Sequence, residues 1–144
     1  MKKKAIVTGA TGQDGSYLVE LLLLKGYHVI ATKRRSNSLG LDNLVNYFAD
    51  EDLEMVNLDI TDPHAVRSLI AEVEPAEFYN LAAQSHVRVS FDNPSVTFDV
   101  NAKAVLNILE AIRIESPNTK FYQASTSEMF GHVQEMPQTE LTPF

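Results

Sequence analysis

The chain has 144 residues, of which 44% are hydrophobic and 22% charged, with only 6 Gly and 6 Pro; this excludes collagen-like and disordered classes and fits one globular domain over residues 1–144. Its 12 Lys and Arg are outnumbered by 19 Asp and Glu, giving a formal net charge of -7, so we expect no nucleic acid partner. Cysteine is absent and the four histidines lie too far apart for a metal-binding helix of the HExxH type, so we also expect no metal site.

Residues 2–4 are all lysine and imitate the start of a secretory signal, but the apolar run that follows them is interrupted at Thr8. The longest aliphatic stretch, residues 21–24, is far shorter than the roughly 20 residues that cross a bilayer. We therefore expect a cytosolic protein with no membrane partner, and the absence of cysteine fits a reducing compartment.

Short runs of aliphatic, β-branched and aromatic residues recur along the chain and are typical of buried strands. The predicted strands cover residues 5–7, 27–32, 53–58, 77–81 and 120–124. Between them, apolar residues return at a period of about 3.6, which is typical of helices. The predicted helices cover residues 16–25, 63–74 and 97–114.

Two of these helices carry further signals. Asp62 and Pro63 supply an N-cap and a first-turn proline to the helix over 63–74. The apolar side predicted for the helix over 97–114 consists of Val100, Ala104, Ile108 and Leu109. Residues 35–52 are ambiguous, because polar residues and glycine at their start suggest a loop. The helical spacing of Leu41, Leu44, Val45 and Phe48 then predicts a loop followed by a helix.

Strands and helices alternate along the chain. This order predicts an α/β protein with a doubly wound parallel sheet of the Rossmann type, right-handed crossovers and helices on both faces. Residues after 129 look irregular, and the sequence stops within this region. We therefore expect the chain to be part of a longer polypeptide.

A glycine-rich turn joins the first predicted strand to the first helix, with Gly9, Gly12 and Gly15 in the pattern GxxGxxG. The first glycine permits a tight turn, the second lets a pyrophosphate approach the main chain, and the third lets helix and strand pack closely. The helix N-terminus adds free N–H groups for phosphates. Turn chemistry alone would also explain three glycines, but their place between strand and helix favours a dinucleotide cofactor. The residues assigned to it here are Gly9, Thr11, Gly12, Gln13, Asp14 and Gly15.

The second strand runs into Lys33, Arg34 and Arg35. In this fold that strand end faces the adenosine ribose, where an acidic residue would accept hydrogen bonds from a free 2′-hydroxyl and cations would bind a 2′-phosphate. We therefore expect NADP rather than NAD, with Arg34 and Arg35 at the phosphate and Lys33 unassigned. The alternative is a solvated basic corner.

The third and fourth strands end in further candidate cofactor contacts. Asp59 could accept a hydrogen bond from the adenine amine while Ile60 packs on the ring; alternatively, Asp59 begins a turn that Thr61 and Asp62 complete. Small residues after the fourth strand would let a ring or ribose approach the backbone, although they also occur where a helix packs tightly. The residues assigned to the cofactor here are Leu81, Ala82, Ala83, Gln84 and Ser85. We interpret His86 as structural.

The fifth strand is followed by Ser125, Thr126, Ser127 and Glu128. Its C-terminal end would lie beside the nicotinamide. If the backbone stays extended, Thr126 and Glu128 project to the same side. A hydroxyl that binds a substrate oxygen next to a carboxylate that takes a proton suits a reaction combining oxidation with elimination. The alternative is a polar loop with a capping Glu.

Four segments carry a resemblance to a known family. They are TGATGQDGSYL at 8–18, the pair Arg34 and Arg35, NLAAQSHV at 80–87 and FYQASTSEMFG at 121–131. In this order they resemble the extended short-chain dehydrogenase/reductases, and within these the GDP-mannose 4,6-dehydratases, over essentially the whole chain. The QASTSE segment is the most specific part. Related dehydratases acting on dTDP-glucose typically carry an acidic residue where this chain has Ser127, and sugar epimerases generally lack the Thr-x-Glu arrangement.

The resemblance implies internal redox chemistry on GDP-mannose. NADP takes hydride from C4, water is lost across C5 and C6, and hydride returns to C6, leaving GDP-4-dehydro-6-deoxy-mannose without net consumption of cofactor. The resemblance places Thr126 near C4 and makes Glu128 the acid and base that takes the C5 proton and assists loss of the C6 hydroxyl. It places Ser85 near both the nicotinamide and the sugar, and it implies a homodimer or homotetramer.

Two features depart from the family pattern. The family's Tyr-x-x-x-Lys pair lies shortly after the point that matches Phe144, and no tyrosine of this chain has lysine four positions later. Many relatives also have Tyr where this chain has Val96. The resemblance also implies that the last strands and a C-terminal substrate domain lie beyond this chain. We therefore expect the amino-terminal, NADP-binding portion of such an enzyme, inactive by itself. The alternatives are a nucleotide-sugar epimerase or reductase of the same superfamily, or an NADP-binding regulator without catalytic activity.

Overall fold

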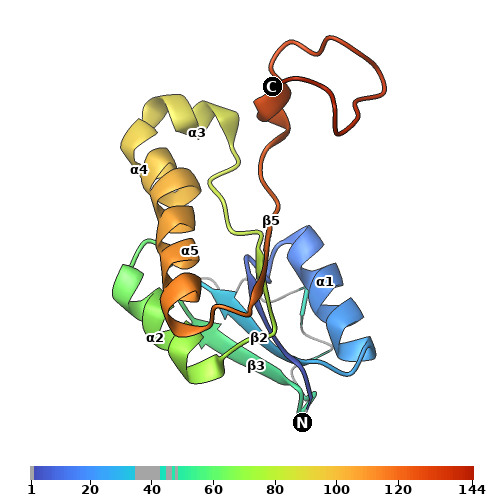
Figure 1. Ribbon diagram of the computed structural model, residues 1–144, viewed down its shortest axis with the longest axis vertical. Helices are drawn as coiled ribbons and strands as arrows, with labels where there is room; N and C mark the ends of the chain where they lie inside the picture. The colour runs from blue at the N-terminus through green and yellow to red at the C-terminus, as the bar shows by residue number, and fades with distance from the viewer. Residues whose placement is uncertain (1, 35–42, 45–46, 48) are drawn as a thin grey trace.

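Five parallel strands form one sheet in the order β3-β2-β1-β4-β5 (Figure 1). The strands are β1 (Lys4–Thr8), β2 (His28–Lys33), β3 (Leu53–Asn57), β4 (Glu77–Asn80) and β5 (Lys120–Gln123). The computed structural model describes residues 2–34, 43–44, 47 and 49–144. The chain starts at the centre of the sheet, runs to one edge and then returns to build the other, which confirms the predicted doubly wound order.

Helices cover both faces of the sheet, with α1 on one side and α2 and α5 on the other (Figure 1). The helical segments are α1 (Gln13–Leu24), α2 (Pro63–Val73), α3 (Val87–Asp92), α4 (Pro94–Phe98), the π-helical turn η2 (Asp99–Lys103), α5 (Ala104–Glu115) and the 3-10 turn η3 (Ser127–Phe130). Among the described residues, no helix is both long and apolar enough to cross a membrane.

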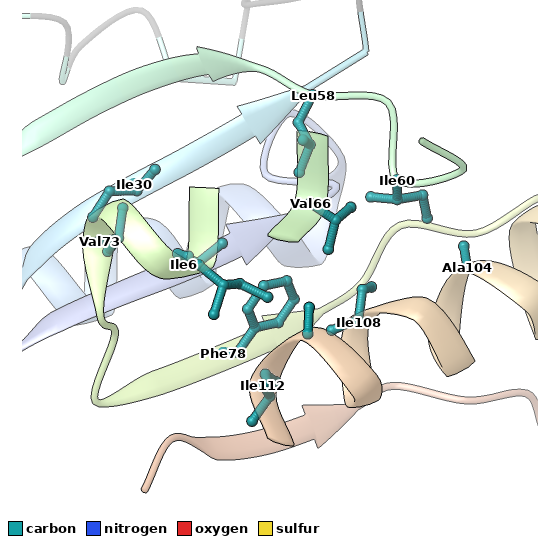
Figure 2. Packing of buried hydrophobic residues seen from close by; sticks show 12 residues of the cluster. Ile6, Ile30, Leu58, Ile60, Val66, Val73, Phe78, Ala104, Ile108 and Ile112 are labelled. Carbon is teal, nitrogen blue, oxygen red and sulfur yellow. The ribbon is translucent and has the colours of Figure 1, made fainter. Parts of the chain in front are cut away.

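The central strands divide their side chains between two apolar layers, because successive residues of a strand point to opposite faces. Ile6 of β1 packs with Phe78 and Ile108 beneath α2 and α5 (Figure 2). Val7, its neighbour, packs with Val19 on the face that α1 covers. Both faces of the sheet are therefore buried, and this explains why β1 and β2 have aliphatic residues at consecutive positions, 5–7 and 29–31, rather than at alternate ones.

The prediction of a single helix over 97–114 is wrong at its start and along its length. The helical run begins at Pro94, which occupies the first-turn position that proline tolerates, and it passes through η2 before α5 begins. The buried residues of α5 are Ala104, Ile108, Ala111 and Ile112. Leu109 was predicted on the apolar side of this helix, but it is not among these buried residues and is 43% exposed.

Other predicted boundaries shift for local reasons. Helix α1 begins at Gln13, three residues earlier than expected, with Gly12 as its N-cap. Helix α3 was not predicted; it has six residues and none is buried, so it carries no apolar periodicity. The predicted loop and helix over 35–52 lies partly outside the described residues. Within its described part, Leu44 is fully buried in the layer beneath α1.

The predicted start of α2 is confirmed by its N-cap. Asp62 Oδ1 accepts hydrogen bonds from the backbone N–H groups of His64 (2.9 Å) and Ala65 (3.2 Å), and Pro63 follows as the first helical residue. These bonds satisfy two of the four N–H groups that a helix start leaves unpaired.

Two tyrosines share one carboxylate at the start of β4. Tyr27 Oη donates to Glu77 Oε1 (3.1 Å) and Tyr79 Oη donates to Oε2 (2.6 Å). The hydrogen bond from Tyr79 lowers the pKa of Glu77. Burial, followed by the bond to Glu77, raises the pKa of Tyr79 to about 12. The cluster ties β4 to the turn that follows α1.

This cluster predicts how stability changes with pH. The contribution of Glu77 is complete above its unfolded pKa of about 4.3 and is lost as pH falls through the lower folded pKa. That of Tyr79 is complete below its unfolded pKa of about 10 and is lost as pH rises through a folded pKa of about 12. We expect Tyr79→Phe to lower the free energy of unfolding by about 1 kcal/mol at neutral pH and to flatten the alkaline loss, as measured by urea unfolding. Tyr17→Phe, at a 65% exposed tyrosine, is the control; an unchanged alkaline loss in Tyr79→Phe would contradict the prediction.

Candidate functional site

The glycine turn between β1 and α1 is held by contacts that exclude side chains. Gly9 has a φ of +67°, and a Cβ on it would lie 2.9 Å from Ala82 N and from Leu81 C. A Cβ on Gly15 would lie 2.8 Å from Ala10 Cα. The first glycine therefore lets the turn touch the segment after β4, and the third lets α1 pack against the turn.

A groove of about 540 Å³ opens beside this turn; we call it the glycine groove. Of the residues assigned to a cofactor from the sequence, those that line it are Gly9, Thr11, Gly12, Arg34, Asp59, Ile60, Leu81, Ala82, Ala83, Gln84 and Ser85. They come from the carboxyl ends of β1, β2, β3 and β4, as expected where parallel strands end at one edge.

Three assigned residues do not line the glycine groove: Gln13, Asp14 and Gly15. Gln13 and Asp14 belong to the first turn of α1, and Gly15 packs behind the turn. Arg35 lies outside the described residues. Six further residues line the groove but were not assigned to the cofactor from the sequence. They are Thr32, Lys33, Leu58, His86, Val96 and Val100. Thr32 and Leu58 end the second and third strand runs, so the strand-end argument used for Asp59 would have found them.

Asp59 serves the turn that the alternative interpretation predicted, and it also lines the glycine groove. Its Oδ1 accepts hydrogen bonds from Thr61 N (3.0 Å) and Thr61 Oγ1 (2.7 Å), and its carbonyl accepts from Asp62 N (3.1 Å). The bonds from Thr61, with a smaller contribution from Arg34, lower the pKa of the Asp59 carboxyl. The carboxylate is therefore a charged acceptor held in one orientation at the wall of the groove.

The segment after β4 is clamped by the π-helical turn η2. Asn101 Oδ1 accepts from Gln84 N (2.8 Å) and Asn101 Nδ2 donates to Gln84 O (2.9 Å). The Gln84 side chain forms two hydrogen bonds with the backbone of His86. It accepts from His86 N (2.8 Å) and donates to His86 O (3.1 Å). Ser85 lies between these two bonded residues, so its position is set by its neighbours. Turns of π-helix often occur at functional sites.

This segment also lines a second hollow of about 770 Å³; we call it the Thr126 hollow. It shares residues 82–86 with the glycine groove. One wall comes from β5 and the residues after it: Gln123, Ser125, Thr126 and Glu128. The helical segments line the rest of it with the apolar residues Val87, Phe91 and Val105 and the polar residues Ser90, Thr97 and Asn101. The two hollows are therefore neighbours along one continuous wall.

The backbone after β5 is not extended through Glu128, so that part of the prediction is wrong. Ser125 has a left-handed φ of +61°, Thr126 is extended, and η3 then begins. Thr126 Oγ1 accepts from Glu128 N (3.2 Å), which caps the turn. Thr126 and Glu128 still both line the hollow. Because the Thr126 oxygen accepts this bond, its hydroxyl hydrogen can be donated to an oxygen in the hollow.

Among the described residues, His, Asp and Glu side chains form no group of three or more that could hold a metal ion. The polar groups that line the two hollows include hydroxyls, amides, the side chains of Lys33, Arg34 and His86, and two carboxylates. Such groups suit a phosphorylated ligand in the glycine groove and proton transfer in the Thr126 hollow.

The sheet order, the glycine turn and the strand-end groove together define a Rossmann-type α/β protein. Residues 6–144 match the family model described as GDP-mannose 4,6 dehydratase. The chain belongs to this family.

Named relatives agree with this membership. A GDP-mannose 4,6-dehydratase from Vibrio cholerae is 50% identical over 151 residues, covering 100% of this chain and 41% of that protein. The human GDP-mannose 4,6 dehydratase is 45% identical over 148 residues, covering 97% of this chain and 40% of that protein. The chain thus spans about two fifths of the length of these curated relatives.

Solved structures share the fold at lower identity. A UDP-N-acetylglucosamine 4-epimerase from Methanobrevibacter ruminantium matches with a TM-score of 0.83 and 26% identity, over 100% of this chain and 44% of that one. A dTDP-glucose 4,6-dehydratase from Bacillus anthracis, solved in complex with NAD, matches with a TM-score of 0.81 and 26% identity, over 99% of this chain and 43% of that one. The fold is thus shared by nucleotide-sugar epimerases and dehydratases.

The contact between the glycine turn and the segment after β4 predicts a difference between two glycines. Gly9 and Gly26 both have a positive φ, but a Cβ on Gly26 would meet nothing within 4 Å. Gly26→Ala should cost only the left-handed strain of about 1 kcal/mol. Gly9→Ala should cost about 2 kcal/mol more, because its Cβ overlaps the Ala82 backbone. The free energy of unfolding in urea measures both, and equal losses would show that the contact is not tight.

Proposed function

We propose that the protein to which this chain belongs is a lyase that converts GDP-mannose to GDP-4-dehydro-6-deoxy-mannose, with NADP as its cofactor. The observation that carries the proposal is the shared wall at residues 82–86. A dinucleotide that lies along the glycine groove would reach the Thr126 hollow, where a hydroxyl and a carboxylate are placed for the chemistry. Membership of the GDP-mannose 4,6 dehydratase family supports the choice of substrate.

The glycine groove fits a phosphorylated dinucleotide. Gly9 and Gly12 leave the backbone open beside the start of α1, where unpaired N–H groups attract phosphate oxygens. Ala82 and Ala83 keep side-chain bulk away from the wall. Arg34 stands at the end of β2, where a 2′-phosphate is expected, and Arg35 is proposed for the same role; Asp59 and Ile60 would hold the adenine. When bound, this cofactor supplies reversible hydride transfer to and from the hexose.

The Thr126 hollow supplies the proton chemistry. The Thr126 hydroxyl donates a hydrogen bond to the oxygen on C4 of the hexose and holds it in place. The Glu128 carboxylate takes the proton from C5 once C4 is a ketone; the C5–H electron pair forms the C5–C6 double bond as the C6–O bond breaks. Glu128 then gives the proton to the departing hydroxyl, which leaves as water. Ser85, on the shared wall, binds the sugar beside the nicotinamide.

The chain contains no Tyr-x-x-x-Lys pair, so we propose that residues beyond these two fifths of the family length complete the site and that this chain alone is inactive. We also propose a homodimer or homotetramer, as the family resemblance implies. Leu106 and Leu109, apolar residues on the exposed side of α5, support an assembly through that helix.

A nucleotide-sugar epimerase is the second candidate, favoured by the fold match to a 4-epimerase. The two activities differ in the product. Dehydration removes the mass of one water from GDP-mannose, whereas epimerisation leaves the mass unchanged. Mass spectrometry of the product formed by the complete polypeptide separates them, and a product of unchanged mass would reject the dehydratase.

Replacement of the proposed acid and base should abolish most of the turnover. We expect Glu128→Gln to lower kcat about 10²- to 10⁴-fold, because loss of an acid or base that moves the proton removes that share of catalysis, with a smaller change in KM. Thr126→Val should also lower kcat. Glu72→Gln, an exposed residue of α2, is the control for the change of charge. Near-normal turnover in Glu128→Gln would remove it from the mechanism.

The proposed phosphate contact predicts a preference between cofactors. The protein should bind NADP more tightly than NAD, and Arg34→Ala should weaken NADP binding about ten- to a hundredfold while leaving NAD binding nearly unchanged, because only NADP carries the 2′-phosphate. Calorimetric titration with each cofactor measures this. Arg113→Ala, at an exposed arginine of α5, is the control. Equal affinities of the unmodified protein for NAD and NADP would contradict the assignment.

A further inference from the structure

A row of three polar side chains crosses the sheet at the base of the site. Thr8 of β1 lies opposite Asn80 of β4, and Asn80 lies opposite Gln123 of β5. Thr8 and Asn80 are fully buried, whereas Gln123 is half-buried and lines the Thr126 hollow. Polar groups buried in a sheet are costly unless they are hydrogen-bonded. Each donor and acceptor in this row therefore needs a hydrogen-bond partner.

The direction of the first bond in the row follows from the main chain. Ala82 N–H can only donate, and it donates to Thr8 Oγ1 (3.2 Å). A threonine hydroxyl has one hydrogen, and Thr8 gives it to Asn80 Oδ1 (2.5 Å). In this arrangement Asn80 turns its oxygen toward Thr8. The reversed amide would place an N–H₂ group against the buried Thr8 hydroxyl and remove the acceptor of its hydrogen, which favours the observed orientation.

The same reasoning determines the orientation of Gln123. With Oδ1 occupied, Asn80 turns Nδ2 toward β5 and donates to Gln123 Oε1 (2.8 Å). The reversed Gln123 amide would bring two N–H₂ groups together, which leaves both donors unpaired. Gln123 thus keeps its oxygen toward Asn80, and the Nε2 group, with two N–H donors, is the polar end that it offers to the hollow it lines.

We propose that Gln123 binds the substrate, with Nε2 donating a hydrogen bond to a hydroxyl oxygen of the hexose. The identity of the hexose rests on the proposed function. Gln123 lines the Thr126 hollow together with Thr126 and Glu128, and it does not line the glycine groove, so its contact is with the sugar rather than with the phosphates of the cofactor. Thr8 and Asn80 act through it as positioning residues, because they hold the donor toward the hollow.

The decisive variant is Gln123→Glu in the complete polypeptide that carries this chain. The introduced carboxylate can still accept from Asn80 Nδ2, but it replaces the donor facing the hollow with an acceptor. We expect the KM for GDP-mannose to rise about ten- to a hundredfold, with the dissociation constant of NADP changed by less than about twofold. Gln138→Glu, the same change at an exposed glutamine, should leave both constants near their original values.

The pH profile distinguishes a lost contact from a damaged fold. As pH falls, the introduced carboxyl becomes protonated and regains an O–H donor. The ratio of the variant KM to the unmodified KM should therefore decrease as the pH is lowered from about 7 toward about 4.3, the ordinary pKa of a glutamic acid side chain. A structural defect alone gives a ratio that does not follow the protonation of this group, and a ratio independent of pH would overturn the inference.

Asn80→Asp tests the positioning from outside the hollow, since Asn80 lines neither hollow. The introduced carboxylate has no N–H for Gln123 Oε1, so the Gln123 amide should turn Nε2 toward it and present oxygen to the sugar. We expect a similar rise in the KM for GDP-mannose with unchanged NADP binding. If this variant does not fold, Gln123→Met tests the inference instead, because it removes the donor without adding charge. We expect it to raise the KM for GDP-mannose about tenfold.

The outcomes separate this inference from the proposed function. An unmodified polypeptide that does not turn over GDP-mannose rejects the proposed function, whatever the variants do. Normal turnover of the unmodified protein with an unchanged KM in both Gln123→Glu and Gln123→Met overturns the inference and leaves the proposed function standing. Weakened NADP binding in Gln123→Glu, with an unchanged KM for GDP-mannose, would assign the donor to the cofactor and would also overturn it.

Discussion

The close approach of the glycine turn to the segment after β4 is the contact on which the site depends. Gly9 lies so near Ala82 that a Cβ on Gly9 would come within 2.9 Å of the Ala82 nitrogen, and the same N–H donates to Thr8 Oγ1. The carboxyl ends of β1 and β4 are thus joined by main-chain contact at Gly9 and, beside it, by the side chain of Thr8. Because the contact at Gly9 is made of backbone, the glycine groove can present N–H groups and open space to a phosphate instead of side chains.

The segment over residues 82–86 lines both hollows, and hydrogen bonds from two other parts of the chain hold it. Thr8 bonds its start and Asn101 bonds its centre at Gln84. These bonds restrict the movement of a segment that lines both hollows. The proposed hydride transfer between cofactor and hexose would depend on such restriction, because a displacement of about 1 Å can cost a hundredfold in rate. The π-helical turn that carries Asn101 therefore belongs to the site as well as to the fold.

The sheet and much of the glycine groove could be predicted because their signals are local. Alternating strands and helices leave parallel pairing with helical crossovers as the natural arrangement, and Asp62 with Pro63 marked the start of α2. Gly9 and Gly12, assigned to the cofactor from their place between strand and helix, line the glycine groove, whereas Gln13 and Asp14 do not. The glycine pattern marks where a helix starts and does not show which first-turn residues line a neighbouring groove. Helix α3 was not predicted, because none of its residues is buried.

The order of residues along the chain was enough to determine the sheet, the glycine turn and the presence of a hydroxyl and a carboxylate after β5. It did not determine the partners of those groups. Thr8 is 72 positions from Asn80, which is 43 positions from Gln123, and Gln84 is 17 positions from Asn101. Such bonds depend on strand register and helix placement to within a few tenths of an ångström. They come into existence only when the sheet has assembled, since no pattern in one strand specifies which residue of another strand will lie opposite it.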